Sequence, residues 1–426
     1  AYMLVHELKN AIHIPIHLHM HDTSGNGIYS YARAIQAGVD IVDVAVSALS
    51  GSTSQPSAGT LYHALEGTER QPDLDIYGFN ALSRYWEDVR KQYAPFESSL
   101  NVPHPEIYEH EMPGGQYTNL LEQAKAVGLG NRFEEVKEMY RRVNLLFGDI
   151  VKVTPSSKVV GDMALFMVQN HLTEEDVIKK GESINFPESV VEFFQGYIGF
   201  PPGGFPKDVE RVVLKNRKPL EKRAGELMPP VNFTGLSREL EQHLKRKPRI
   251  EEILSYCLYP KVYLDFQEKY ARYGDLSCLD TPTFFYGMKV GEELAVEIER
   301  GKTLFIKLVS IGEAKPDGSR TLYFELNGQM REVLVRDYSV KTDVKERQKA
   351  DPNNPHHIGA TMPGTVVKLL VQKGDHLSKG DPLAITEAMK METTLQAPFN
   401  GMVEDIFVKE GDPIQQGDLL ILLVKK

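Results

Sequence analysis

Apolar and polar residues alternate over two stretches near the carboxy terminus, and the second stretch repeats the first. The first is residues 363–385, PGTVVKLLVQKGDHLSKGDPLAI, and the second is residues 399–422, FNGMVEDIFVKEGDPIQQGDLLIL. Gly364 matches Gly401 and Leu383 matches Leu420, both at an offset of 37 residues. Alternation interrupted by Gly-Asp turns is typical of short, half-buried strands. The two halves therefore predict a flattened β-sandwich with quasi-twofold symmetry.

Other periodicities precede the sandwich. Strand-like runs joined by polar turns occupy residues 288–337 and predict a small β-barrel or meander. Helical apolar spacing continues from residue 236 to about residue 273. Near the amino terminus a period-2 strand, a helix from about Tyr29, the run VDIVDVAV and a further helix alternate along the chain. That alternation favours a parallel α/β barrel, whose active site lies at the carboxyl ends of its strands.

These patterns predict a multidomain α/β protein. Residues 1–285 would form the carboxy-terminal part of a TIM-type (β/α)8 barrel with a helical extension, residues 286–340 a β-rich region, and residues 357–426 the sandwich. Residues 341–356, KTDVKERQKADPNNPH, are charged and then rich in Pro and Asn, a composition that predicts a flexible linker. A tether of this kind would let the sandwich swing between distant sites, although an ordinary interdomain spacer fits the same residues.

Three histidines lie on one face of the predicted amino-terminal strand. In AIHIPIHLHMHDTSGNG, His17, His19 and His21 alternate with apolar residues, so their side chains point the same way. Residues two apart in a strand are roughly 7 Å apart and can share one metal ion, whereas residues four apart, at roughly 13 Å, can hardly do so. The pattern therefore predicts a metal site made by either the 17/19 pair or the 19/21 pair, against the alternative of hydrogen-bonded core histidines.

The amino-acid composition argues against several classes of binding partner and against a disulfide-rich fold. The net charge of −10 and the isoelectric point near 5.8 argue against nucleic acid or an anionic membrane surface as a general partner. Only two cysteines occur, Cys257 and Cys278, which excludes a disulfide framework and fits a reducing cytoplasm. The sequence contains no run of about eighteen apolar residues, so no membrane span is predicted. The start, AYMLVHELKNAI, is typical of the middle of an amphipathic helix, so we expect the chain to begin inside a domain.

The stretch EAMKMETT, residues 387–394, connects the two halves of the sandwich. Lys390 would project from the tip farthest from the chain ends, between Met389 and Met391. A solvated turn lysine is the ordinary explanation, but methionines are core side chains and gain nothing from exposure. A tip lysine between side chains that an enzyme could grip suits a modifying enzyme. AMKM within this repeat resembles the biotinyl (biotin carboxyl carrier) domain, in which the lysine carries biotin; lipoyl domains are similar but usually have Asp before the lysine and Ala after it.

The amino-terminal part resembles the carboxyltransferase domain of the pyruvate carboxylase family. The matching stretches are HLHMHDTSG, DVAVSALSGSTSQPS, YEHEMPGGQYTNL, FGDIVKVTPSSKVVGDMA and FPESVVEFFQGYIGFPPGGFP. The resemblance implies that His19 and His21 bind a divalent metal ion (Mn²⁺, Zn²⁺ or Mg²⁺) and that His17 supports them. It implies that Thr154 carries a proton near the biotin and that Ser157 belongs to the biotin pocket. Without the resemblance, Thr154 would be interpreted as a helix cap.

The resemblance also implies the reaction and its partners. A carboxyl group would pass from carboxybiotin on Lys390 to the enolate of pyruvate, giving oxaloacetate, after an ATP- and bicarbonate-using domain has charged the biotin. Biotin protein ligase would attach the cofactor. The resemblance also implies a homotetramer that is controlled by acetyl-CoA or another small effector. The ATP-dependent domain and the family's metal-binding Asp, substrate-binding Arg and carboxylated Lys have no counterpart in this sequence, so we expect the chain alone to be incomplete for catalysis.

Two alternatives remain open. The α subunit of sodium-pumping oxaloacetate decarboxylase and the related transcarboxylase subunit share the barrel, but they usually carry Ala where this chain has Asp22, and they lack SGSTSQPS. A non-enzymatic carrier fused to an inert barrel would need no metal, and the three-histidine strand argues against it.

We expect the purified protein to carry a biotin-sized mass increment on Lys390 when it is produced with an active biotin ligase. Intact-mass and peptide-mass measurements test this directly. A bare Lys390 under those conditions would mean that EAMKMETT has been misinterpreted.

Overall fold

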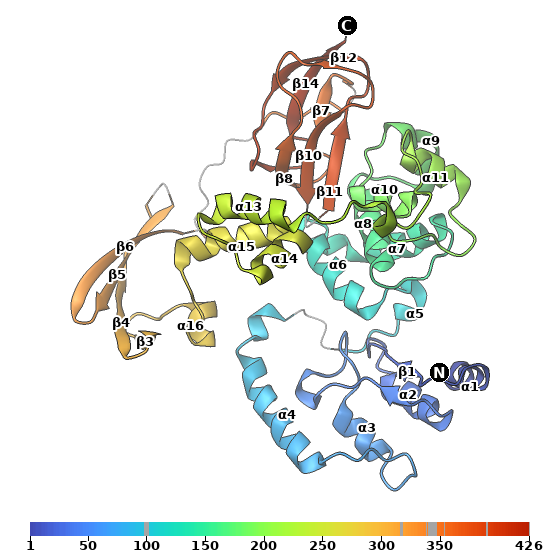
Figure 1. Cartoon of the computed structure of the whole chain (residues 1–426), viewed down its shortest axis with the longest axis vertical. Helices are drawn as coiled ribbons and strands as arrows, with labels where there is room; N and C mark the ends of the chain where they lie inside the picture. The colour runs from blue at the N-terminus through green and yellow to red at the C-terminus, as the bar shows by residue number, and fades with distance from the viewer. Residues whose placement is uncertain are drawn as a thin grey trace. The chain divides into compact units, whose positions relative to one another are not determined.

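The computed structural model describes residues 1–97, 102–315, 318–337, 339, 347–352, 354–388 and 391–425. It separates into two compact units, one formed by Ala1–Leu227 with Arg347–Lys426 and the other by Met228–Glu346 (Figure 1). The division near residue 227 does not coincide with the predicted domain boundary at 285, which stays a prediction. Over the described residues, no helix combines the length and the apolar character that a membrane span requires.

The first unit begins as a strand–helix–strand segment. β1 (His17–Leu18) pairs in parallel with β2 (Ile41–Val42), and α2 (Gly27–Gln36) connects them. Tyr31 and Ala34 of α2 pack in a buried cluster with Val5 of α1 (Tyr2–Ala11). Parallel pairing through a crossover helix is the local geometry of an α/β fold. A closed barrel needs more strands than this segment contains, so the barrel itself stays a proposal.

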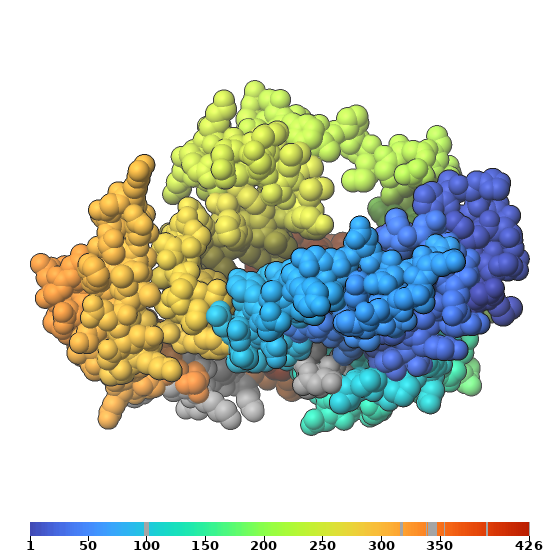
Figure 2. Space-filling model, turned by 90° about the horizontal axis from the view of Figure 1, so that it is seen from below, coloured from blue at the N-terminus to red at the C-terminus, as the bar shows by residue number. Residues whose placement is uncertain are grey.

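Three short helices and one long one follow β2. A 3₁₀ helix, Ser47–Leu49, and α3 (Ala58–Ala64) lead to α4 (Ile76–Lys91), and a further 3₁₀ turn spans Ala94–Phe96. The side chains of the α4 segment, in light blue, form part of the face seen in Figure 2. Tyr77 and Tyr85 of this helix are exposed.

Residues 107–227 form a layer of helices around one central helix, α8 (Ser156–Gln169). α8 is buried on nearly every side because its sequence, SSKVVGDMALFMVQ, is apolar all round. Its largest neighbours in the core are Tyr140, Phe147 and Phe194. The elements are α5 (Ile107–His110), α6 (Gly114–Ala126), 3₁₀ Gly130–Arg132, α7 (Phe133–Leu146), α8 (Ser156–Gln169), α9 (Glu174–Lys180), 3₁₀ Gly181–Ser183, α10 (Glu188–Gln195), α11 (Lys207–Leu214) and α12 (Ala224–Leu227).

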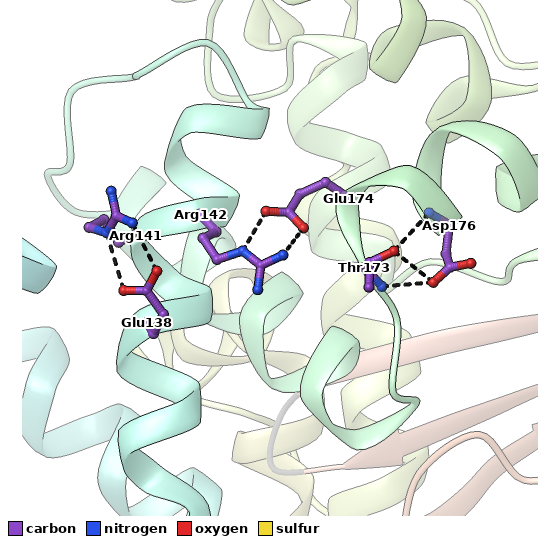
Figure 3. Close-up of polar contacts among 6 residues, drawn as sticks. All are labelled: Glu138, Arg141, Arg142, Thr173, Glu174 and Asp176. Carbon is purple, nitrogen blue, oxygen red and sulfur yellow. Dashed lines mark hydrogen bonds and ion pairs between the residues drawn. The ribbon is translucent and has the colours of Figure 1, made fainter.

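Charged pairs fasten the outer helices of this layer, as Figure 3 shows. Arg142 of α7 makes a two-pronged ion pair with Glu174 at the start of α9. α9 is also closed by a capping box, since Thr173 Oγ1 accepts from the Asp176 backbone N–H and Asp176 Oδ2 accepts from the Thr173 N–H. Glu138 pairs with Arg141 one turn along α7 and adds little, because that pair is solvent-exposed.

The predicted sandwich is present in residues 357–425. One sheet has the strand order β11-β10-β8-β13 and the other β7-β14-β12-β9, so each sheet takes strands from both halves of the repeat. Leu383 and its repeat partner Leu420 are fully buried between the sheets. The strands are β7 (His357–Gly359), β8 (Gly364–Leu369), β9 (His376–Leu377), β10 (Pro382–Ala388), β11 (Met391–Gln396), β12 (Gly401–Ile406), β13 (Pro413–Ile414) and β14 (Leu419–Lys425).

The repeated glycines Gly364 and Gly401 have a steric reason. A Cβ on Gly364 would lie 2.0 Å from the carbonyl oxygen of Glu387 on the neighbouring strand, and one on Gly401 would lie 2.4 Å from that of Val424. Only glycine allows the strands to approach this closely. The sequence repeat is therefore a repeat of two close strand contacts.

Part of the predicted linker 341–356 packs on the sandwich. Residues 341–346 lie outside the described residues, but residues 347–352 run along the sandwich. Lys349 forms a bridge with Asp418 and an ion pair with its carboxylate at 2.7 Å, and Arg347 pairs with Asp412 at 3.0 Å. Sequence composition could not anticipate these contacts, because the acidic partners lie more than sixty residues further along the chain.

The second unit contains four helices and one sheet within the described residues. Leu240, Ile253, Tyr256 and Tyr263 form its helical core. The strands follow the order β3-β4-β5-β6 with antiparallel neighbours, so the region is an open meander and the predicted small barrel is not formed. The elements are α13 (Phe233–Leu244), α14 (Ile250–Leu258), α15 (Pro260–Tyr273), α16 (Thr281–Tyr286), β3 (Glu293–Glu299), β4 (Lys302–Ile311), β5 (Ser319–Leu326) and β6 (Gln329–Arg336).

We expect Gly364→Ala to destabilise the sandwich by roughly 1–3 kcal/mol, because the added methyl group forces the β8 and β10 backbones apart. The matched control is Thr365→Ala, which changes the next, exposed position of the same strand and should cost less than about 0.5 kcal/mol beyond its strand propensity. Denaturant-dependent hydrogen exchange of the sandwich amides measures both. Equal effects of the two substitutions would contradict the close contact.

Candidate functional site

Two of the three strand histidines share one carboxylate. His17 Nε2 and His19 Nδ1 each lie 2.7 Å from an oxygen of Asp43, which follows β2. Hydrogen bonds from His17 and His19 lower the pKa of Asp43, so this carboxylate is held in its charged form. The arrangement leaves His19 Nε2 available, while His17 has already used its Nε2. Asp43 was not predicted as part of this site, although an acidic residue at the end of the neighbouring parallel strand could have indicated it.

The ring of the third histidine, His21, is oriented by a backbone carbonyl group and not by Asp43. His21 Nδ1 lies 2.5 Å from the backbone carbonyl of Thr53. A carbonyl only accepts, so Nδ1 carries the proton and Nε2 of the neutral ring keeps its lone pair. The rings of His19 and His21 lie edge to face, with centroids 5.3 Å apart. Both rings thus have the support on Nδ1 that metal-binding histidines use.

The metal site that the sequence predicts at these histidines stays a prediction. Among the residues that the structure describes, no group of three or more His, Cys, Asp or Glu side chains could hold a metal ion. Two imidazole nitrogens with oriented rings suit a divalent transition metal, and further ligands would have to complete the coordination.

The loop before α6 packs directly on His21. A Cβ on Gly114 would lie 2.3 Å from Thr23 Oγ1 and 2.8 Å from His21 Cβ, so the glycine permits a close backbone approach. His110 shapes this loop, because its Nδ1 accepts from the Met112 N–H at 3.0 Å. Burial lowers the pKa of His110 to about 4, and the nearby Lys137 charge adds to the effect. The ring is therefore a neutral structural acceptor near neutral pH.

α6 connects the histidine segment to α8. Gln116 of α6 approaches Gly161 so closely that a Cβ there would lie 2.7 Å from its amide nitrogen. Thr154 is exposed just before α8 begins, and the residue in the capping position is Pro155, which makes no side-chain cap. Ser157, in the first turn, is buried. Thr154 is therefore not the helix cap that its position alone suggested.

A buried carboxylate lies one turn further along α8. Asp162 is fully buried, and one of its oxygens receives the Lys158 ammonium at 2.5 Å and the Ser189 hydroxyl at 2.7 Å. Burial raises the pKa of Asp162. Since Ser189 belongs to α10, Asp162 fastens α8 to α10 and holds Lys158 beside Ser157. The contact of Lys158, Asp162 and Ser189, called the latch below, was not predicted, since nothing in the local sequence pattern shows that Asp162 is buried.

The sandwich packs against the same two helices. Met362, Ala388 and Met391 are buried in the helical cluster and not in the sandwich's own core. Lys390, the predicted attachment site, and Met389 lie outside the described residues. Their described neighbours Ala388 and Met391 are both buried in the helical cluster.

Two family profiles match separate parts of the chain. The profile of a conserved carboxylase domain matches residues 107–307, and that of biotin-requiring enzymes matches residues 356–423. The pyruvate carboxylase of Bacillus subtilis is 60% identical over 425 residues, which is 100% of this chain and 37% of that protein. The Staphylococcus aureus pyruvate carboxylase is 55% identical over the same shares. The chain thus spans just over a third of the length of these relatives.

Solved structures give the same picture. A complete multifunctional pyruvate carboxylase from Rhizobium etli is 44% identical with a TM-score of 0.70, covering 99% of this chain and 39% of that one. The carboxyl transferase domain of the Rhizobium etli enzyme with pyruvate and biocytin is 47% identical with a TM-score of 0.72, covering 79% of this chain and 57% of that one.

We expect His19→Ala, made in the polypeptide that contains this chain, to lower bound divalent metal at least about tenfold, because His19 belongs to both candidate pairs. His21→Ala should do the same for the pair that the resemblance implies. Metal content after dialysis, measured by atomic emission, gives the answer, with the exposed His63→Ala as the control. Loss in His17→Ala instead of His21→Ala would move the site to the other pair, and full retention in His19→Ala would contradict both.

Proposed function

The chain matches, along its whole length, the C-terminal portion of pyruvate carboxylases, and from this premise we propose that it performs the carboxyl-transfer half of pyruvate carboxylation. The observation that carries the proposal is the 60% identity over 425 residues together with a carboxylase domain and a biotin domain in one chain. The alternatives, an oxaloacetate decarboxylase or transcarboxylase subunit and an inert carrier, are tested by the assay below.

Lys390 is the proposed attachment point of biotin. Bound there, biotin would supply a mobile carrier of an activated carboxyl group. The chain's own contribution is the antiparallel pair of strands β10 and β11, which flank Lys390 in the sequence on either side. Substrate and product would be pyruvate and oxaloacetate.

His19 and His21 are the proposed metal ligands. A divalent ion held there (Mn²⁺, Zn²⁺ or Mg²⁺) would act as a Lewis acid toward the carbonyl oxygen of pyruvate. Asp43 and Thr53 orient the two rings through Nδ1, which fixes the direction of each Nε2 lone pair. Gly114 excludes a side chain from the space against His21 and so keeps the loop before α6 tight.

Thr154 is the proposed proton carrier. Its hydroxyl can accept a proton from the methyl group of pyruvate on one lone pair while it gives up its own proton, which few side chains do at neutral pH. Its exposed position before α8 leaves the hydroxyl free for a reactant. Ser157 would line the biotin pocket, and the latch of Lys158, Asp162 and Ser189 would keep the first turn of α8 in place.

The wider assembly is also proposed. The strand–helix–strand start would complete a TIM-type barrel with further strands of the longer polypeptide, and the ATP- and bicarbonate-using step would take place on a separate domain. The meander of the second unit would help assemble a homotetramer, and acetyl-CoA or another small effector would regulate it. Biotin protein ligase is the modifying partner, and the cytoplasm is the proposed location, in keeping with the bacterial relatives and the two unpaired cysteines.

An assay of the polypeptide that contains this chain tests the function. Oxaloacetate should form from pyruvate only when ATP and bicarbonate are both supplied, as followed by NADH-linked reduction of the product. Decarboxylation of oxaloacetate without any ATP-dependent carboxylation would favour the oxaloacetate decarboxylase alternative.

Within that assay, we expect Thr154→Ala to lower the rate of oxaloacetate formation by about 10²- to 10⁴-fold, the usual contribution of a positioned proton carrier. Thr154→Ser keeps the hydroxyl and should remain within about tenfold of the parent. Thr173→Ala, which removes the capping hydroxyl of α9, serves as the matched control and should change the rate little. Wild-type rates in Thr154→Ala would remove Thr154 from the mechanism.

A further inference from the structure

The start of helix α6 lies against His21, one of the proposed metal ligands. A Cβ on Gly114 would lie 2.8 Å from His21 Cβ, and one on Gly115 would lie 3.6 Å from His21 Cε1 and 3.8 Å from His21 Nε2. Nε2 is the ring nitrogen that the contact of Nδ1 with Thr53 leaves free. The two glycines therefore bring the backbone of the helix start next to the nitrogen that would bind the metal.

This helix start has backbone donors that the helix itself does not use. α6 has 13 residues, and the N–H group of Tyr117 donates to the carbonyl of Pro113 at 2.9 Å. The N–H groups of Gly114, Gly115 and Gln116 come before it and have no carbonyl of the helix to donate to. Pro113, in the capping position, makes no side-chain cap. Aligned peptide dipoles add a partial positive charge at this end, so the helix start favours a negatively charged group.

Two buried polar side chains beside the helix start also lack a partner. Gln116 is 8% exposed and Thr23 1%, and neither Gln116 Nε2 nor Thr23 Oγ1 has a hydrogen-bond partner among the described residues. Thr23 packs on Gly114, where any side chain would collide with its hydroxyl. Side chains of a helix lean toward its N-terminus, so the Gln116 amide belongs to this end of α6. Buried donors are nearly always satisfied, so these groups require an acceptor that the described residues do not supply.

The Gln116 amide also contacts helix α8. A Cβ on Gly161 would lie 2.7 Å from Gln116 Nε2, so the amide lies directly on α8, and Figure 1 shows the two helices side by side. Ser157, which would line the biotin pocket, comes four residues before Gly161 and therefore lies on the same face of α8. The start of α6 thus contacts the proposed metal ligand His21 through its glycines and the face of the proposed biotin pocket through Gln116.

We propose that the start of α6 binds a carboxylate, namely the carboxyl group that pyruvate gains when it becomes oxaloacetate. The donors are the N–H groups of Gly115 and Gln116, the Gln116 side-chain amide and the Thr23 hydroxyl. A carboxylate only accepts hydrogen bonds, so it matches a set of atoms that can all donate. The inference rests on the proposed function, because it takes carboxyl transfer as the reaction of this site.

The contacts of α6 indicate which carboxylate is bound. α6 contacts both the side of the proposed metal ligand and the side of the proposed biotin pocket, so we assign to it the carboxyl group that passes between the two reactants. The first carboxylate of the keto acid is present in pyruvate and oxaloacetate alike, whereas the second is present only in oxaloacetate. The site should therefore distinguish the two compounds.

Binding of both keto acids to a Gln116→Met variant tests the inference. The polypeptide that contains this chain is produced without biotin, so that it cannot exchange carboxyl groups through the carrier, and is titrated with oxaloacetate or pyruvate in a calorimeter. Loss of one hydrogen bond to a charged group should raise the Kd of oxaloacetate at least about tenfold and leave that of pyruvate within about twofold. The Tm should equal or exceed that of the parent, because an unpartnered buried amide is replaced by an apolar side chain.

A second variant and a control belong to the same experiment. Gly115→Ala makes only ordinary contacts with His21, and alanine favours a helix more than glycine does, so its Tm should not fall. Its methyl group takes up space beside the donors and should also weaken oxaloacetate binding, by about tenfold or more. Asn119→Ala, at an exposed position of the same helix, should change neither Kd. Metal content, measured by atomic emission, should be the same in Gln116→Met and in the parent.

The outcomes separate the inference from the function on which it rests. Equal weakening of both keto acids, or unchanged binding of both, would overturn the carboxylate assignment while leaving the proposed function intact. A lowered Tm or a loss of metal in Gln116→Met would give Gln116 a structural role and overturn the assignment in the same way. A parent polypeptide that bound neither keto acid would overturn the proposed function and the inference together.

Discussion

The close packing of α8 is the constraint on which the rest of the first unit depends. Most of this helix is apolar and buried, and α6, α7, α10 and the sandwich supply the cover. Gly161 lets Gln116 approach from α6, and Asp162 fastens α10 through Ser189. The first turn of α8, with Ser157 and Lys158, is consequently held in one position before any substrate arrives.

Burial of a carboxylate at Asp162 is costly, and its position explains why it is tolerated. Only one of its oxygens has partners among the described residues, while the other is buried without one. Removing Lys158 would leave an uncompensated charge inside the helical core. The latch therefore couples the conformation of Lys158 to the packing of two helices, which suits a residue that lies beside a proposed cofactor pocket.

The sandwich uses one end for two purposes. Its flanking residues are packed as core residues against α8 and α10, yet the proposed chemistry requires the same end to be reached by other proteins and domains. Arg347 and Lys349, within the predicted linker, are bound along the sandwich through Asp412 and Asp418.

The sequence by itself determined the sandwich and its internal repeat, because alternation and Gly-Asp turns are local properties of the chain. It predicted three histidines on one face of a strand, whereas the observed strand β1 ends at Leu18 and contains only His17 of the three. Only the tertiary structure decided that Asp43 joins His17 to His19, that Met391 packs into a helical core and that the β-rich region is the meander, not the barrel, of the two predicted alternatives. Each of these depends on which distant segments pack together, and residue patterns along one segment carry no information about the surface that will cover it.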